Sequence, residues 1–357
     1  MLSRVHLSAI FVGLLLSQVS AWHGNGHYIT AYIAQEYLAR TNPDALAWAN
    51  NILLPFTQMC GENLYSFVEA ATWSDKIKDQ GWHLLDSHHF ISNPWYDQGA
   101  VPGFFEMEPN ANIIFAITDD IKTLSSTKED PYGSSKSLLG KSIALRTMIH
   151  YFGDIHQPLH AEERVTPNLP NGDMGGNLFP IKHYNNTQMD NLHFIWDEMF
   201  DNFSESIRSN LPTPLYNFIK QKGDSIMQEH PYESLKDQMI KNNNATSWGL
   251  ESFAIGSTFA YKDIQPSQDL PQSYQDVGYS ICRERVAIGG YRLGVTLDQI
   301  YKHINQPTLE TTAWFKMMTQ ENKHASKQLT SQSQEAYKVN KRKQQRAVEE
   351  RVATKSE

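Results

Sequence analysis

The amino-acid sequence predicts a mainly α-helical single domain with long loops. Apolar residues recur at helical spacing in several segments, whereas long strand-like alternation of apolar and polar residues is absent. The chain has 357 residues, of which 40% are hydrophobic and 20% charged, a balance typical of globular proteins with a sizeable core. One large domain therefore accounts for most of the chain.

Five segments carry the helical period. In the first of them, the apolar residues on one face are Ile29, Ile33, Ala34 and Leu38. Helices are expected over residues 27–38, 112–124, 137–152, 205–227 and 280–304. The best short strand candidate is residues 177–182.

Two loops and a tail complete the expected organisation. Residues 92–110 are rich in proline, glycine and aromatic residues, and residues 161–177 carry two prolines followed by a Gly-Gly pair. From about residue 320 the composition changes to Gln, Lys, Ser and Glu with almost no aromatic residues. We therefore expect one folded domain over residues 22–319 and a polar, flexible tail over residues 320–357.

The first 21 residues predict a secretory signal peptide. Arg4 lies in a short amino-terminal region, an apolar run covers residues 9–16, and Val19-Ser20-Ala21 fits a cleavage site. The run is too short to span a bilayer. We expect a protein without a membrane anchor that begins at Trp22 and is secreted, or delivered to a lysosome or digestive vacuole. Three sequons suit N-glycosylation on that route: Asn185, Asn202 and Asn244.

Charge and cysteine content limit the classes of function. A net charge of −8 argues against a broad phosphate-binding surface, but it is compatible with an enzyme whose nucleic-acid contacts are confined to a cleft. Only Cys60 and Cys282 are available, so the chain has either one disulfide bond or two free thiols. A thiolate zinc site is disfavoured, and any metal must be held by nitrogen and oxygen.

Histidine and aspartate are concentrated in the stretch "HYFGDIHQPLH" at residues 150–160. His150 and Asp154 are four positions apart, so they project from one face of a helix, and His193 and Asp197 repeat this arrangement. An imidazole and a carboxylate one turn apart can bind a divalent ion, and these donors suit zinc. Exposed ion pairs and helix caps show the same spacing, so the spacing alone leaves both interpretations open.

Further nitrogen and oxygen donors lie upstream. Asp75 occurs in "ATWSDKIK", His89 in "DSHHFIS", and Trp22 and His27 in "WHGNGH". Cleavage before Trp22 would free an α-amine with a pKa near ~7.7, which can act as a nitrogen ligand. Taken singly, each of these residues also has an ordinary structural explanation as a core tryptophan, a hydrogen-bonded histidine or a helix cap.

Taken together, these motifs resemble the zinc-dependent S1/P1 nuclease family of single-strand-specific nucleases and 3′-nucleotidases. The resemblance covers roughly residues 22–304 and rests on W-x4-H, W-S-D, H-F-I, H-x3-D-x5-H, G-G-N, N-L-H-x2-W-D and G-G-Y-R-L. It implies the helical fold shared by zinc phospholipase C and P1 nuclease, and three zinc ions (Zn²⁺) held by nine residues.

The resemblance also implies which residues hold each ion. The first zinc is assigned to Asp75, His89, His150 and Asp154. The second is assigned to the amine and carbonyl oxygen of Trp22 and to His27, with Asp154 bridging. The third is assigned to His160, His193 and Asp197. The histidines left out of the set are His23, His83, His88, His156 and His183.

The chemistry implied by the resemblance is hydrolysis of a phosphodiester. Two zinc ions about 3.5–4 Å apart can share a water and lower its pKa for attack on phosphorus. Asp75 is expected to orient that water, and Lys78 to neutralise charge on the phosphoryl group. Lys78 is otherwise explained as a surface lysine.

Base recognition is expected from a small set of residues. Phe90 would stack on the base, Met174 would form the opposite wall, and Asn177 would add a polar contact. A core phenylalanine is the ordinary alternative for Phe90. The chain departs from the family pattern at Ser92 and in a longer loop between His160 and Gly175, which leaves base preference open.

The function implied is cleavage of single-stranded DNA and RNA to 5′-phosphorylated products, together with hydrolysis of 3′-nucleotides, by a secreted monomer. Zinc-dependent phospholipase C is one alternative, but the spacing of Trp22 and His27 and an aspartate at position 197 favour the nuclease. A secreted zinc-binding protein without catalysis is the other alternative, although it leaves Lys78 and Phe90 unexplained.

Overall fold

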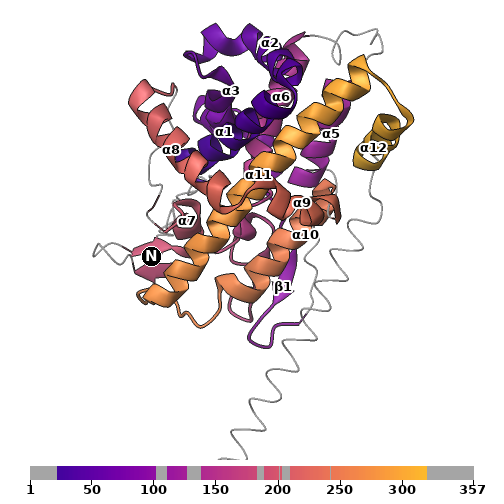
Figure 1. The fold of residues 1–357 in the computed structure, drawn as a ribbon. Coiled ribbons are helices and arrows are strands. Elements are labelled where there is room, and N and C mark those ends of the chain that lie inside the picture. The colour runs from indigo at the N-terminus through magenta and orange to yellow at the C-terminus, as the bar shows by residue number, and fades with distance from the viewer. Residues whose placement is uncertain are drawn as a thin grey trace, which may run out of the picture.

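Helix α11 (Gln272–Asn305) is the axis against which the other helices pack (Figure 1). In this computed structural model, the described residues are 22–101, 111–126, 138–182, 189–200, 202, 210–241 and 243–319. The expected signal peptide, the carboxyl-terminal tail, His183 and the sequon at Asn185 lie outside them.

Helices account for most of the described elements. The longer ones besides α11 are α1 (Gly24–Thr41), α2 (Pro43–Cys60), α5 (Ile113–Ser125), α6 (Leu138–Asp154), α8 (Thr213–Glu229), α9 (Tyr232–Lys241), α10 (Ala245–Ile255) and α12 (Leu309–Thr319). The short ones are α3 (Ser66–Glu69), η1 (Ala70–Thr72), α4 (Trp73–Lys76), η2 (Ile77–Gln80), η3 (His83–His89), η4 (Pro158–His160), α7 (Leu192–Asp197) and the π-helical turn η5 (Gly256–Ala260).

Strands are few and short. The parallel pair joins β1 (Pro94–Tyr96) to β2 (Glu163–Val165), with Pro94 opposite Glu163. The antiparallel pair joins β3 (Pro180–Lys182) to β4 (Met189–Asn191). Both pairs lie in the loop regions and help to position those loops beside the helices.

The mainly α-helical fold is confirmed. The segments expected at 27–38 and 280–304 fall within α1 and α11. Those expected at 112–124 and 137–152 match α5 and α6, which are described from one residue later. The segment expected from residue 205 is described as helix only from Thr213. The expected strand at 177–182 is only the three residues of β3.

Helix α2 is missing from the sequence-based expectations. It begins where Asn42 accepts a hydrogen bond from the backbone N–H of Ala45, with Pro43 in the first turn. It ends at Gly61, whose φ of 67° is in the left-handed region. The interior Pro55 removes one backbone donor, which weakens the local helical pattern in the sequence.

The Gly-Gly pair of the "GGYRL" motif lets α11 approach α1 and α6 closely. A Cβ on Gly290 would lie 2.6 Å from Cβ of Ile33, and a Cβ on Gly289 would lie 3.0 Å from the carbonyl oxygen of Phe152. Side chains at these positions would push the helices apart. The pair therefore lets α11 lie close to α1, which carries His27, and to α6, which carries His150.

A buried polar network fastens the end of α6 to α11. Arg292 donates from Nη1 to Nε2 of His156 at 2.8 Å and also pairs with Glu251. His156 donates from Nδ1 to the carbonyl oxygen of Phe152 at 2.7 Å. Burial lowers the pKa of His156 well below its ordinary value, which agrees with a neutral ring that accepts from Arg292.

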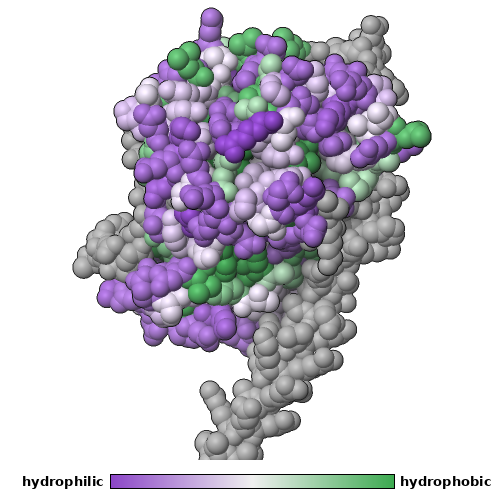
Figure 2. Space-filling view, in the orientation of Figure 1, coloured by the Kyte–Doolittle hydropathy of each residue, from purple (hydrophilic) through white to green (hydrophobic). Residues whose placement is uncertain are grey.

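The surface and the cysteines complete the description. The face shown in Figure 2 is mostly hydrophilic, with separate apolar patches. Among the described residues, no helix is both long enough and apolar enough to cross a bilayer. Cys60, which is half-buried, and Cys282, which is buried, are free thiols, so the disulfide alternative is not formed.

Candidate metal and nucleotide site

One buried cluster of donors is centred on Asp154 at the end of α6. Its Oδ1 lies 3.3 Å from His27 Nε2, and its Oδ2 lies 2.9 Å from His89 Nδ1 and 3.2 Å from His150 Nε2. Burial acts to raise the pKa of Asp154, but His150 and the other two histidines outweigh it, so the pKa lies well below its ordinary value. Asp154 is therefore an ionised carboxylate surrounded by imidazoles from three different elements.

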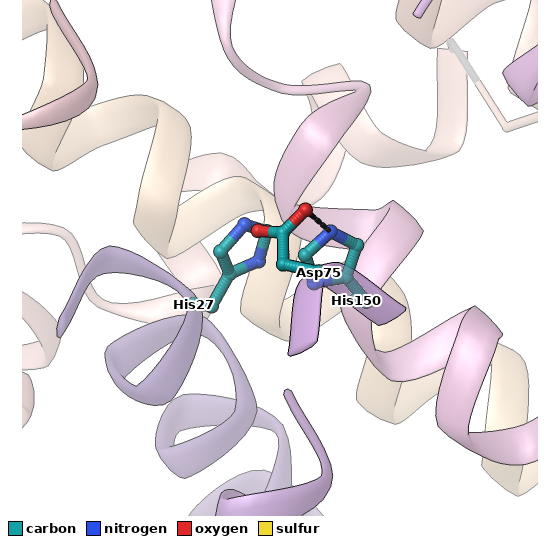
Figure 3. A group of neighbouring side chains, drawn as sticks. All are labelled: His27, Asp75 and His150. Carbon is teal, nitrogen blue, oxygen red and sulfur yellow. Dashed lines mark ion pairs between the residues drawn. The ribbon is translucent and has the colours of Figure 1, made fainter. Parts of the chain in front are cut away.

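Asp75 on α4 completes this cluster. Its Oδ1 lies 3.6 Å from His89 Nδ1 and 3.6 Å from His150 Nε2. Figure 3 shows Asp75 between His27 and His150, whose side chains converge on it from α1 and α6. Lys78, which is only 7% exposed, donates from Nζ to Asp75 Oδ1 at 2.8 Å. Lys78 is a buried cation at the edge of this cluster and not a surface lysine.

A second cluster joins η4 to α7. His160 Nε2 lies 3.1 Å from His193 Nε2, and His193 Nε2 lies 3.4 Å from Asp197 Oδ2. Gln157 donates to the other oxygen of Asp197 at 2.7 Å. The pair four positions apart on α7 therefore shares one face, as expected, and His160 meets that face from another element.

Backbone carbonyl groups fix which ring nitrogen of three histidines carries the proton. The contact at Nδ1 is Ala71 O at 2.6 Å for His150, His89 O at 2.7 Å for His160 and Gly175 O at 2.7 Å for His193. A carbonyl oxygen can only accept, so each Nδ1 carries a hydrogen. Each ring thereby directs Nε2 to the centre of its cluster, and in the neutral form that nitrogen offers its lone pair there.

These facing donors suit a bound cation. Burial lowers the pKa of His160, and His193 lowers it further, to about 3, so His160 itself does not take a second proton near neutral pH. Burial, together with the charges of Asp154 and Asp75, raises the pKa of Asp197 well above its ordinary value. Among the described residues, Nδ1 of His27 and Nε2 of His89 are buried nitrogens without a hydrogen-bond partner. Nitrogen and oxygen donors in this arrangement fit zinc.

The donor atoms form three groups, each within 4.8 Å: His27, Asp75 and His150; His89, His150 and Asp154; and His160, His193 and Asp197. The first two groups share His150 and form one continuous cluster. These groups consist of histidine and aspartate donors alone, so the expected pairing of His27 with Trp22 stays a prediction. Among the described histidines, none of His23, His83, His88 and His156 belongs to a group.

Trp22 lies between the two clusters. Its side chain is fully buried, and its Nε1 donates to the carbonyl oxygen of Gly153 at 2.9 Å. The backbone N–H of the next residue, His23, donates to the carbonyl oxygen of Asp197 at 2.9 Å. The predicted mature terminus is therefore held beside Asp154 on one side and Asp197 on the other.

A cavity of about 250 Å³ adjoins the second cluster. Its lining residues are Phe90, Ile91, Ser92, Leu159, Glu162, Glu163, Met174, Gly175 and His193. Phe90 and Met174 are thus brought together as expected. Asn177 is absent from the lining, and its Nδ2 instead donates to the carbonyl oxygen of Met174 at 2.9 Å.

Three buried carboxyl groups beside this cavity were missed in the sequence. Glu162 accepts from Trp95 Nε1 at 2.5 Å and from the Tyr261 hydroxyl at 2.8 Å, and the same hydroxyl lies 2.8 Å from Asp173. Burial and the Asp173 charge raise the pKa of Glu163 to about 8. In the sequence, "AEERV" looks like a solvated loop, and only tertiary contacts reveal its burial.

Comparisons with known proteins agree on one family. Residues 22–302 match the family model described as S1/P1 Nuclease. The chain is 28% identical over 312 residues to Nuclease S1 of Aspergillus oryzae, covering 80% of this chain and 94% of that protein. It is 26% identical over 301 residues to Endonuclease 3 of Arabidopsis thaliana, covering 83% of this chain and 94% of that protein. It is 25% identical over 301 residues to Nuclease P1 of Penicillium citrinum, covering 78% and 98%.

The raised pKa of Glu163 predicts a pH-dependent stability difference. Folding raises this pKa from 4.5 to about 8, so the unfolded chain loses the proton first and wild type loses stability as pH rises through that range. A Glu163→Gln variant does not titrate there. Relative to wild type, its free energy of unfolding should rise by on the order of 2 kcal/mol between about pH 5 and about pH 8. Denaturant titrations check this, and a constant difference would contradict it.

Proposed function

Because the chain belongs to the S1/P1 nuclease family, we propose that it is a secreted, zinc-dependent phosphodiesterase that cleaves single-stranded DNA and RNA to 5′-phosphorylated products and also hydrolyses 3′-nucleotides. Family membership makes the chain a nuclease, which is a hydrolase of phosphoric ester bonds. It thereby disfavours the zinc phospholipase C and the non-catalytic alternatives.

The zinc proposal rests on the arrangement of His160 and His193. Their Nε2 atoms lie 3.1 Å apart and face each other in a buried site with Asp197. We assign the nine donor residues to three ions. The first would be held by Asp75, His89, His150 and Asp154. The second would be held by the amine and carbonyl oxygen of Trp22 and by His27, with Asp154 shared. The third would be held by His160, His193 and Asp197.

Bound zinc supplies the chemistry that side chains lack, since it lowers the pKa of water toward ~7 and stabilises negative charge on phosphate oxygens. Asp75 accepts hydrogen bonds through its ionised carboxylate and would orient the attacking water. Lys78 holds its ammonium 2.8 Å from Asp75, next to the donor cluster, and would offset the charge that develops on the phosphoryl group.

Base binding is assigned to the cavity beside His193. Phe90 and Met174 line it, so a base would stack on the ring of Phe90 with the side chain of Met174 on its other face. Asn177, whose Nδ2 donates to the carbonyl oxygen of Met174, would add a polar contact to the base beside Met174. A paired base would first have to leave its helix, and this requirement favours single-stranded DNA, RNA and 3′-nucleotides as partners.

Export and processing complete the proposal. We assign residues 1–21 to a signal peptide, residues 22–319 to the catalytic domain and residues 320–357 to a polar tail. The family match beginning at Trp22 supports cleavage before that residue. Cleavage would create the amine that the zinc assignment requires of Trp22.

The proposed activity predicts a specific response to substrate and metal. Purified mature protein supplied with zinc should cleave denatured DNA and RNA much faster than duplex DNA and leave 5′-phosphates. Chelation should abolish cleavage and lower the melting temperature, because metal binding is coupled to folding, and added zinc should restore both. Gel assays and calorimetry check this. Release of phosphocholine from lecithin without cleavage of nucleic acid would contradict it, as would the absence of any hydrolysis with zinc present.

The role of Lys78 predicts a loss of catalysis without loss of metal. Lys78→Met should lower kcat roughly 100-fold, the magnitude expected for one lost charge-stabilising donor. Its zinc content should be unchanged, because an ammonium is not a ligand. Lys76→Met is the matched control, since Lys76 lies two positions away and lines a different cavity with Trp73 and Trp82. Equal activities for the two variants would refute the assignment.

A further inference from the structure

The backbone at Met174 and Gly175 adopts an unusual conformation beside the base cavity. Met174 has a φ of 58° and Gly175 a φ of 60°, both in the left-handed region. A methionine disfavours this region, because its Cβ crowds the backbone there. The segment therefore depends on contacts from elsewhere in the protein to hold its shape.

Glu163 supplies those contacts from the strand β2. Its backbone is fixed by pairing with β1 and by a bond from its N–H to the carbonyl oxygen of Asn93 at 2.9 Å. Its carboxyl accepts from the backbone N–H of Met174 at 2.5 Å, and it also hydrogen-bonds with the backbone of Gly175 and the side chain of Ser92. One carboxyl group thus joins both walls of the cavity, since Ser92 follows Phe90 by two positions.

The loop wraps tightly around this carboxyl. A Cβ on Gly172 would lie 2.1 Å from Glu163 Oε1, so the chain passes too close for a side chain at that position. Glu162 does not share this role, because its carboxyl is engaged by Trp95 and Tyr261. Glu163 is therefore the side chain whose contacts determine the position of Met174.

The same segment also orients a proposed zinc ligand. The carbonyl oxygen of Gly175 is 2.7 Å from Nδ1 of His193, which must donate to it. A Cβ on Gly175 would lie 2.4 Å from the carbonyl oxygen of Leu159, so the segment packs directly on the residue before His160. A shift of Met174 and Gly175 would thus disturb both the base cavity and the ring of His193.

We propose that Glu163 is a positioning residue of this nuclease, whose carboxyl sets the width of the base cavity through Met174 and orients His193 through Gly175. The proposal rests on the proposed function, because it presumes that the cavity takes the base of a nucleotide substrate. It explains why the chain has a glutamate at the base of the longer loop. The acid is needed to hold that loop in a strained but fixed conformation.

Kinetics on substrates with and without a base test this proposal. With zinc saturating, Glu163→Ala should raise KM for adenosine 3′-monophosphate about tenfold, a loss near 1.4 kcal/mol, and change KM for bis(4-nitrophenyl) phosphate less than about threefold. Glu163→Gln should restore KM to within about threefold of wild type, because its amide oxygen can accept the same N–H groups. Equal effects of Glu163→Ala on both substrates would overturn the proposal.

Glu69→Ala is the matched control. Glu69 is as buried as Glu163, at 5% exposure, and it likewise accepts from backbone N–H groups, those of Asn63 and Leu211. It lines a different cavity. Its loss should lower the melting temperature while leaving the ratio of the two KM values unchanged. A similar change of ratio in both variants would mean that Glu163 has only a general structural role.

Zinc retention gives a readout that does not depend on turnover. Competition with a chelator should show the weakest-held zinc bound about tenfold less tightly in Glu163→Ala than in wild type or Glu69→Ala, since groups that orient ligands typically affect affinity by this much or more. Unchanged retention would overturn the link to His193. If wild type hydrolysed neither nucleotides nor nucleic acid, the proposed function would fail. Zinc retention would still test whether Glu163 orients His193, because it does not require turnover.

Discussion

The structure depends on burying carboxylates and imidazoles together, with their donor atoms directed inward. At Asp154 three rings from α1, η3 and α6 face one carboxylate, and at Asp197 two rings face each other at 3.1 Å. At the second cluster burial disfavours a second proton on His160, whereas at the first cluster Asp154 and Asp75 outweigh burial and raise the pKa of His150. Divalent cations bound at each cluster would be coordinated by these donors. The donors that would bind metal therefore also lie where the helices pack together.

The rest of the fold holds those donors in place. Carbonyl groups of Ala71, His89 and Gly175 set the tautomers, and each comes from an element that itself borders the site. The glycines at 289 and 290 allow α11 to seat against the helices that carry the first cluster. Helices thus supply donors at fixed angles, while the loops after η3 and η4 shape the adjoining cavity.

Local periodicity made the helices and the two His-x3-Asp pairs predictable, because residues four apart share a helical face whatever the tertiary fold. The remaining donors were assigned through resemblance, since no local rule brings distant residues together; they are Trp22, His27, Asp75, His89 and His160. Helix α2 was missed because Pro55 interrupts its pattern, and Glu163 was missed because burial of a charged loop residue is a tertiary property. The grouping of His27 with Asp75 and His150 likewise emerges only from the packing of α1 on α6.

The most direct test of the central claim is anomalous X-ray scattering at the zinc edge from crystals of the mature protein. The account predicts anomalous peaks within bonding distance of Asp154 and of the group formed by His160, His193 and Asp197, with the amine of Trp22 bound to one of the ions beside Asp154. A well-ordered crystal grown with zinc that shows no peak at either cluster, or one in which that amine points away from both, would contradict it.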